Sequence, residues 1–393
     1  MIHFNEMGLN KALIEQLHNM QFSNPTPIQE KAIPIALTGK DILGSAKTGT
    51  GKTAAFAIQE RAKKSWCREE GWNNLDPGGG KASNRKKALD FVLPNLPKLE
   101  HVYNSLSDEQ SRDLLVKLMA YRALGYKKVR LPLNTPHYWK QREETQENWA
   151  VADAMDTGFR DWQVFRTDLR KYGYPFILFL RGIQTQLLLE QYCCACEDGS
   201  ALFIKAEPGD AVIDAGGCYG DTAFYFAHKV GPEGKVLSFE FLPDHLQIFN
   251  RNLALNPDYS SQIELIENPL WSESGVDLYV EGSGPGTRVR GHPEDPSASR
   301  VTTRSIDDVI TEQALGLDLI KMDIEGAELE ALKGAEKSIQ TYRPKLAISV
   351  YHRLHDFWEI PQWIESLNLG YRFFLRHFTI HAEETVLFAI TDH

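Results

Sequence analysis

The most constraining feature of the chain is a regular alternation of short, β-rich apolar runs with helical segments after Ala201. Such alternation is typical of a parallel sheet covered by helices on both faces. Because only a short connection separates the last two runs and a parallel crossover needs a dozen or more residues, these two are expected to pair antiparallel. The sequence therefore predicts a doubly wound, seven-stranded α/β domain over residues 201–393, with strands at 211–215, 235–240, 263–267, 318–322, 345–350, 371–378 and 385–390.

Three further regions precede this domain. Residues 1–58 show helical periodicity that gives way to a loop rich in glycine and threonine. Residues 59–90 carry little periodic hydrophobicity and contain a run of three glycines, which indicates a linker. Residues 91–200 are expected to form a helical accessory region, in which one helix begins near Asp108.

Bulk properties limit the class of protein. A chain of 393 residues exceeds the usual size of one domain. A formal net charge of −10 argues against a broad electrostatic grip on nucleic acid, so no nucleic-acid partner is expected. The apolar runs are too short to cross a bilayer, and residues 1–6 lack the start of a secretory signal. We therefore expect no membrane association and a cytoplasmic location.

The five cysteines do not indicate a disulfide framework, because their number is odd and three of them crowd together at positions 193, 194 and 196. We expect reduced thiols. No second pair of cysteine or histidine ligands lies near this cluster, so it does not predict a metal site.

The strongest local motif is the turn from Asp214 to Thr222, which joins a buried strand to a helix rich in phenylalanine and alanine. Glycines there let the backbone turn sharply and approach a ligand, and the helix amino terminus directs free N–H groups into the crevice. Ala215 stands where a dinucleotide-binding motif has its first glycine, which favours S-adenosylmethionine over a nicotinamide cofactor. The alternative is a turn that merely connects two elements.

A carboxylate follows the next predicted strand, at Glu240, where folds of this kind place a ribose-binding acid. Its oxygens can accept hydrogen bonds from both ribose hydroxyls, although an acid at a strand end can also be merely solvated. The predicted cofactor-binding residues are therefore Asp214, Gly216, Gly217, Gly220 and Glu240.

A third motif, residues 318–328, delivers several carboxylates and a glycine to the carboxyl edge of the sheet. Ligands bind at that edge in open α/β sheets. Burying these acids for structure alone would be costly, so at least one is expected to contact a substrate or a polar network. The alternative for Glu325 and Glu328 is that they lie in a first helical turn, where acids are favoured.

From about Leu93 to Ala389 the chain resembles FkbM-type methyltransferases. The resemblance implies S-adenosylmethionine as the methyl donor and, usually, oxygen as the acceptor atom, but it does not name the acceptor. We expect methyl transfer to a hydroxyl group of a small molecule or glycan. The resemblance also implies cofactor contact by Asp214, Gly216, Gly220 and Glu240. The matching segments are residues 214–222, 238–240, 252–257, 305–308, 321–328, 344–352, 376–377 and 384–388.

A hydroxyl nucleophile requires a base or a charge-stabilising group within hydrogen-bond reach. The candidate catalytic residues are Asp323, Glu325 and His352. A neutral imidazole at His352 has a suitable pKa, and a histidine of the core is the alternative. A magnesium ion held by Asp323 and Glu325 is a further alternative that the sequence does not decide. His377 and His381 stay outside the predicted site.

Residues 1–58 resemble a different family, the DEAD-box RNA helicases. Residues 22–29 are similar to the adenine-reading Q motif, which includes Gln29, and residues 46–53 to the phosphate-binding loop. In that loop, Gly49 and Gly51 would free N–H groups for phosphates, Lys52 would neutralise them and Thr53 would hold magnesium.

The helicase likeness stops near Ile58, and the sequence contains no Asp-Glu-Ala-Asp run. We therefore interpret residues 1–58 as a truncated helicase-like segment fused to an enzyme. Three hypotheses follow: a methyltransferase, a nucleotide- and RNA-binding protein that acts through residues 1–58, and a sheet that binds cofactor without catalysis.

Overall fold

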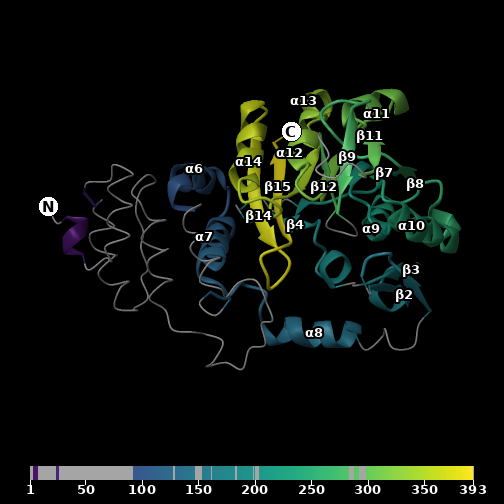
Figure 1. Ribbon diagram of the computed structural model, residues 1–393, viewed down its shortest axis with the longest axis horizontal. Coiled ribbons are helices and arrows are strands. Elements are labelled where there is room, and N and C mark those ends of the chain that lie inside the picture. The colour runs from purple at the N-terminus through teal and green to yellow at the C-terminus, as the bar shows by residue number, and fades with distance from the viewer. Residues whose placement is uncertain are drawn as a thin grey trace. The chain divides into compact units, whose positions relative to one another are not determined.

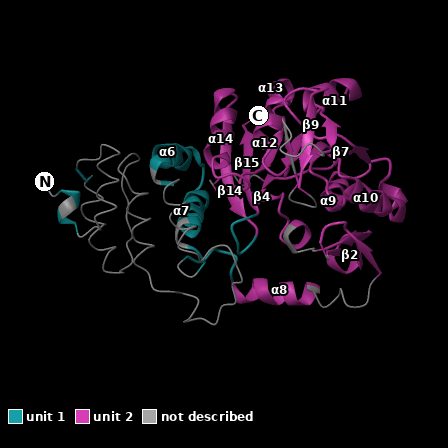
Figure 2. Ribbon diagram, viewed as in Figure 1, with its two compact units in different colours: residues 1–134, 379–383 teal, residues 135–378, 384–393 magenta. Residues whose placement is uncertain are grey.

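The computed structural model describes residues 3–7, 24–25, 92–126, 129–146, 153–160, 162–181, 184–197, 199, 203–282, 287–291 and 298–392. They divide into two compact units (Figure 2). One unit comprises residues 1–134 and 379–383, and the other comprises residues 135–378 and 384–393. Within the described residues, no helix is both long enough and apolar enough to span a membrane.

The first unit contains helices that follow the apolar pattern of the sequence. Asp108 caps the second long helix, because its side chain accepts a hydrogen bond from the Ser111 amide at 2.8 Å. The helix start expected near Asp108 is confirmed. The described helices of this unit are η1 (Phe4–Glu6), η2 (Leu93–Asn95), α6 (Leu96–Ser105) and α7 (Glu109–Leu124).

The second unit is built on a seven-stranded sheet (Figure 1). Its strand order is β14-β15-β13-β12-β6-β7-β8, in which the five strands from β13 to β8 are parallel and the pairs β13–β15 and β14–β15 are antiparallel. The strands are β6 (Ala211–Ala215), β7 (Lys235–Phe239), β8 (Ile263–Ile266), β12 (Leu319–Met322), β13 (Lys345–Ser349), β14 (Tyr371–His377) and β15 (Thr385–Thr391).

This sheet confirms the predicted α/β fold. Every strand lies within one residue of its expected bounds, and the last two strands pair antiparallel as the short connection required. The central parallel strands β6, β7 and β12 are buried over most of their length, which is why their sequences are largely apolar.

Two groups of helices cover the sheet. In one group, α11 packs against α13 and α12 packs against α14. In the other group, α9 packs against η5 and α10 packs against β3. The described helices of this unit are α8 (Pro136–Gln146), η4 (Arg170–Tyr172), the π-helix η5 (Gln184–Leu188), α9 (Asp221–Val230), α10 (Pro243–Leu255), η6 (Pro257–Tyr259), α11 (Ile306–Gln313), α12 (Glu328–Lys333), α13 (Glu336–Tyr342) and α14 (Asp356–Ser366).

Residues 91–200 are not helical throughout, and this expectation is wrong from residue 154 onward. Three antiparallel strands form a small sheet, β1 (Ala154–Asp156), β2 (Gln163–Asp168) and β3 (Ile177–Leu180), and β4 (Cys194–Ala195) pairs with β5 (Phe203–Ile204). The physical reason is that short apolar runs fit a buried strand as well as one or two helical turns, so periodicity cannot separate them.

A second small sheet lies in the chain between β8 and β12. Its strands are β9 (Asp277–Glu281), β10 (Arg288–Arg290) and β11 (Arg300–Thr302), in the order β10-β9-β11. This sheet was not predicted from the sequence, because charged residues and glycines interrupt the alternation on which strand prediction depends.

Candidate functional site

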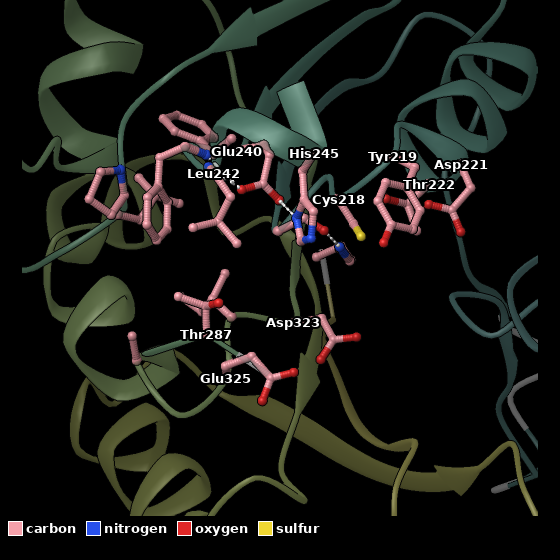
Figure 3. A pocket seen from close by; sticks show the side chains of 18 of the residues that line it. Cys218, Tyr219, Asp221, Thr222, Glu240, Leu242, His245, Thr287, Asp323 and Glu325 are labelled. Carbon is pink, nitrogen blue, oxygen red and sulfur yellow. Dashed lines mark hydrogen bonds and ion pairs between the residues drawn. The ribbon is translucent and has the colours of Figure 1, made fainter. Parts of the chain in front are cut away.

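A cavity of about 460 Å³ opens at the carboxyl edge of the seven-stranded sheet (Figure 3). The residues that directly follow three adjacent strands line it: Gly216 after β6, Glu240 after β7 and Asp323 after β12. Parallel strands bring such residues together because their carboxyl ends meet at one edge. The cavity therefore unites the three motifs that the sequence placed far apart along the chain.

The glycine turn after β6 is shaped by close packing. Gly216 has a φ of +85°, and a Cβ at this position would lie 2.0 Å from the carbonyl oxygen of Asp323. Gly220 has a φ of +91° and begins α9 against the ring of Phe249. Only glycine fits both positions without strain. Of the predicted glycines, Gly216 lines the cavity, whereas Gly217 and Gly220 are not among its lining residues.

Asp214 lies behind this turn and does not line the cavity. Its side chain is fully buried and accepts hydrogen bonds from Thr222 Oγ1 at 2.9 Å and Ser238 Oγ at 2.8 Å. Lys321 Nζ lies 2.9 Å from Asp214 Oδ1 and also donates to the carbonyl oxygens of Ala215 and Gly216. The ion pair of Asp214 and Lys321 thus stabilises the conformation of the turn.

Glu240 lines the cavity together with His245 of α10. Glu240 Oε1 accepts hydrogen bonds from the amides of Phe241 at 2.7 Å and Leu242 at 2.9 Å. Glu240 Oε2 lies 3.0 Å from His245 Nδ1, and Figure 3 shows the two side chains joined by this contact. The histidine was not predicted as a site residue, and its only signal in the sequence is a place five residues after the acid.

Asp323 is fixed by two tyrosines. Tyr351 Oη donates to Asp323 Oδ1 at 3.0 Å, and Tyr192 Oη donates to Oδ2 at 3.3 Å. Burial raises the pKa of both tyrosines, and the charge of Asp323 raises it further, so both hydroxyls keep their protons. The two tyrosines also line the cavity.

His352 is buried directly behind Asp323. Its Nδ1 lies 2.8 Å from Glu328 Oε1, and its Nε2 lies 3.3 Å from Asp323 Oδ1 and 3.6 Å from Glu325 Oε2. Burial alone would lower the pKa of His352, but Glu328 first, then Asp323 and Glu325, raise it to about 10. An imidazolium at neutral pH is therefore the expected state, in place of the neutral base that the sequence suggested. His352 does not line the cavity.

Glu325 lines the cavity from a strained loop. Its φ is +56°, and the following Gly326 has a φ of +95°. A non-glycine residue in this region costs about 1–3 kcal/mol and tends to persist at functional sites. Figure 3 shows Asp323 and Glu325 next to each other on the cavity wall. Both candidates thus reach the space that a ligand would occupy.

Metal binding was left open at Asp323 and Glu325. The structure instead groups donor atoms of Asp323, Glu328 and His352 within 4.8 Å of one another. However, the two ring nitrogens of His352 face different carboxylates, Glu328 on one side and Asp323 on the other. This geometry fits an imidazolium between two acids better than three donors that converge on one ion.

The cavity is acidic overall. Among the described residues that line it, five carboxylates stand against two cationic side chains, Arg181 and Lys321, and Lys321 is paired with Asp214. Burial raises the pKa of Asp221 to about 6, and the Asp214 charge adds to the rise while Lys321 opposes it. Such a wall suits a ligand that carries positive charge. The lining carboxylates are Asp221, Glu240, Asp323, Glu325 and Glu384.

The nucleotide-binding residues predicted in the helicase-like segment 1–58 lie outside the described residues. This applies to Gln29, Gly49, Gly51, Lys52 and Thr53, and to the linker at 59–90.

His377 is buried, and its Nδ1 lies 2.9 Å from Thr385 Oγ1. It does not line the cavity.

Comparison with known proteins finds the same family that the motifs of the seven-stranded sheet resemble. Residues 214–373 match the family model described as the methyltransferase FkbM domain. The crystal structure of a methyltransferase FkbM from Methylobacillus flagellatus KT resembles the chain with a TM-score of 0.50 at 21% sequence identity. The similarity covers 78% of this chain and 62% of that one. At this level of identity the structural likeness concerns the fold.

The amino-terminal resemblance is also confirmed, although it extends beyond Ile58, where the sequence predicted its end. Residues 26–71 match the family model of the DEAD/DEAH box helicase. The ATP-dependent rRNA helicase RRP3 of Eremothecium gossypii is 64% identical over 55 residues, 14% of this chain and 11% of that protein. The ATP-dependent RNA helicase CshA of Listeria monocytogenes is 52% identical over 58 residues, 15% and 11% of the two chains. The chain thus spans about a tenth of the length of these relatives.

Proposed function

Because residues 214–373 form a methyltransferase FkbM domain, we propose that the enzyme transfers a methyl group from S-adenosylmethionine to a hydroxyl oxygen of a small molecule or glycan. The observation that carries this proposal is a single cavity that contains Gly216, Glu240 and Asp323. One end offers the features of an adenosine site. The other offers a fixed carboxylate next to open space.

At the cofactor end, the fit rests on shape and charge. Gly216 leaves room that a Cβ would fill, and the helix α9 begins beside it, at Asp221. Glu240 is positioned for the ribose, and Asp221 supplies negative charge for a sulfonium or an ammonium group. When bound there, S-adenosylmethionine supplies the methyl carbon, whose bond to sulfur breaks, with the electron pair leaving on sulfur, as the acceptor oxygen attacks.

At the acceptor end, Asp323 is the proposed base. Its carboxylate lines the cavity, and the hydroxyls of Tyr192 and Tyr351 hold it in one orientation. The proton of the acceptor hydroxyl passes to a carboxylate oxygen as the new oxygen–carbon bond forms. A base held within hydrogen-bond reach contributes about 10²–10⁴-fold to such a step.

His352 acts behind Asp323 as a positioning residue. The imidazolium lies 3.3 Å from Asp323 Oδ1, and Glu328 fixes the opposite side of the ring at 2.8 Å. The ring therefore helps to hold Asp323 in place and presents a positive charge to its carboxylate. Glu325 completes the wall and is the candidate to orient a second hydroxyl of the acceptor.

Methyl transfer from labelled S-adenosylmethionine to a panel of sugars and phenols tests this proposal, together with calorimetric titration of S-adenosylmethionine. We expect binding of the cofactor and label in at least one hydroxyl compound. Well-folded protein that gives no heat with S-adenosylmethionine would overturn the assignment.

A second candidate function rests on the 64% identity of one segment to an RNA helicase. It assigns ATP and RNA binding to residues 1–58. Thermal unfolding separates the two candidates, because a ligand raises the melting temperature of the state that binds it. S-adenosylmethionine should stabilise the protein under the first proposal, and magnesium-ATP under the second.

A further inference from the structure

One cation in the cavity wall has no acidic partner. Arg181 directly follows β3, is partly buried and lines the cavity. Within the described part of the chain its guanidinium forms no ion pair or hydrogen bond, and it lies over the ring of Trp162 at 4.1 Å from the ring centroid. The second lining cation, Lys321, is already paired with Asp214. Arg181 therefore keeps its five N–H donors for water or a ligand.

The unpaired state of Arg181 is informative because the cavity wall is acidic. Five carboxylates line the same cavity. An arginine that only neutralised this wall would be expected to pair with one of them, since opposite charges attract more strongly in a partly buried site than in water. Contact with Trp162 holds the guanidinium apart from these acids instead.

The aromatic support under Arg181 is itself fixed. Trp162 directly precedes β2, and its carbonyl oxygen accepts a hydrogen bond from Thr157 Oγ1 at 2.8 Å. The ring of Phe159 meets the indole edge to face at a centroid distance of 5.4 Å. The guanidinium is therefore restricted before a ligand arrives, which lowers the entropy cost of binding. A carboxylate matches such a planar group with two parallel hydrogen bonds.

Two molecules in the proposed reaction could supply a carboxylate, the cofactor through its methionine part and the acceptor. The groups at the cofactor end, Gly216, Asp221 and Glu240, belong to the seven-stranded sheet and its first helix. Arg181 and Trp162 instead come from the small sheet β1-β2-β3 and its loops. Substrate specificity generally resides in elements added to a common fold, so this origin favours the acceptor.

We infer that Arg181 binds a carboxylate of the acceptor, so that the compound methylated is a hydroxy acid, such as a uronic acid of a glycan. The rest of the wall repels an anion, so the acid group is accepted beside Arg181 and disfavoured elsewhere. One orientation of the acceptor in the cavity is thereby selected. This inference rests on the proposed function, because it assumes methyl transfer to a hydroxyl group.

The test uses acceptors in matched pairs that differ in one charged group. The pairs are methyl glucoside with its uronic acid, methyl galactoside with its uronic acid, and hydroxybenzamide with hydroxybenzoate. Transfer from labelled S-adenosylmethionine gives kcat and KM for full-length wild type, Arg181→Gln, Arg181→Lys and Trp162→Leu, and calorimetry gives the affinity of each protein for S-adenosylmethionine. Arg166→Gln is the matched control, because Arg166 is exposed on the neighbouring strand β2 and does not line the cavity.

We expect label in the acid member of at least one pair, with a lower KM than for its neutral partner. Arg181→Gln should raise the KM for that acid about 10–100-fold and leave kcat nearly unchanged, as for the loss of a charge-assisted contact away from the reacting atoms. Arg181→Lys keeps the charge without the planar donors, and Trp162→Leu keeps the guanidinium without its support, so both should raise KM by less. Affinity for S-adenosylmethionine should not change, and Arg166→Gln should match wild type.

Several outcomes would overturn this inference. Label that enters a neutral member as readily as its acid partner does so while leaving the proposed function intact, and label in none of the acids also overturns it. A lower affinity of Arg181→Gln for S-adenosylmethionine, with equal losses for acid and neutral acceptors, would assign Arg181 to the cofactor's carboxylate. If Arg181→Gln does not fold, the preference of wild type for the acid members and the KM of Arg181→Lys decide. Wild-type protein that binds no S-adenosylmethionine overturns both the proposed function and this inference.

Discussion

Lys321 and Asp214 are register partners on the adjacent parallel strands β12 and β6, and their side chains form a fully buried ion pair with Nζ 2.9 Å from Oδ1. Burial would lower the pKa of Lys321, but Asp214 and the neighbouring acids raise it above its usual value. The lysine also donates to the carbonyls of Ala215 and Gly216. One ion pair thus links the sheet to the turn that shapes the cavity.

Removing one partner of this pair should destabilise the protein strongly. We expect Lys321→Met to lower the free energy of unfolding by about 3–5 kcal/mol, because it leaves the Asp214 charge buried without a partner. The double variant Lys321→Met with Asp214→Asn should recover much of that loss. Urea unfolding followed by tryptophan fluorescence measures both. A double variant as unstable as the single one would contradict this account of the pair.

Asp323→Asn should reduce kcat by about 10²–10⁴-fold, since the amide cannot accept the proton of the acceptor hydroxyl. The affinity for S-adenosylmethionine should stay within a few-fold of wild type. Asp318→Asn is the matched control: Asp318 directly precedes β12 and accepts from the Ala211 amide at the opposite end of the strand. Equal turnover in Asp323→Asn and wild type would remove Asp323 from the mechanism.

The fold was predictable because the central parallel strands β6, β7 and β12 are mostly buried and therefore stand out in the sequence as short, largely apolar runs. The short connection between residues 378 and 385 alone fixed the direction of the last pair. The small sheets β1-β2-β3 and β9-β10-β11 were not predictable in the same way. Their strands are short and partly exposed, so they lack that signal.

The candidate site was predictable where a residue directly follows a strand, as Gly216, Glu240 and Asp323 do. It was not predictable where function depends on which atoms face the cavity. Asp214 looks like a ligand-binding acid in the sequence. In the structure its carboxylate instead forms an ion pair with Lys321 and accepts hydrogen bonds from Thr222 and Ser238. Conversely, His245 lies five residues after Glu240, in the first turn of α10, and only the fold reveals that the two side chains meet.

The pKa of Asp221, raised to about 6 mainly by burial, predicts a pH-dependent affinity for the cationic cofactor. Below this value the carboxyl takes up a proton and loses its attraction for a sulfonium or ammonium group. Affinity for S-adenosylmethionine should therefore fall as pH drops through about 6, by at most tenfold per pH unit. Calorimetry between pH 5 and pH 8 with wild type and Asp221→Asn measures this. A pH profile of the same shape in both proteins would assign the dependence to another group.

His352 should make stability depend on alkaline pH. Its pKa of about 10 in the folded protein lies above the ordinary value of 6.5, because the acids around the buried ring outweigh the effect of burial. The imidazolium therefore contributes its full stabilisation below about pH 6.5, and the contribution is lost as pH rises through about 10. Between these values the free energy of unfolding should fall by up to about 1.4 kcal/mol per pH unit.

The variant His352→Asn separates this effect from general alkaline unfolding. At pH 7 it should be less stable than wild type by about 3–5 kcal/mol, because Glu328 then stays buried without its cation. Its stability should also vary less between pH 7 and pH 10. His355→Asn, at a half-exposed position three residues later, should keep the wild-type slope. If His352→Asn keeps the full slope, the imidazolium between Glu328 and Asp323 does not carry the alkaline dependence, and His352 is neutral when Asp323 meets the acceptor.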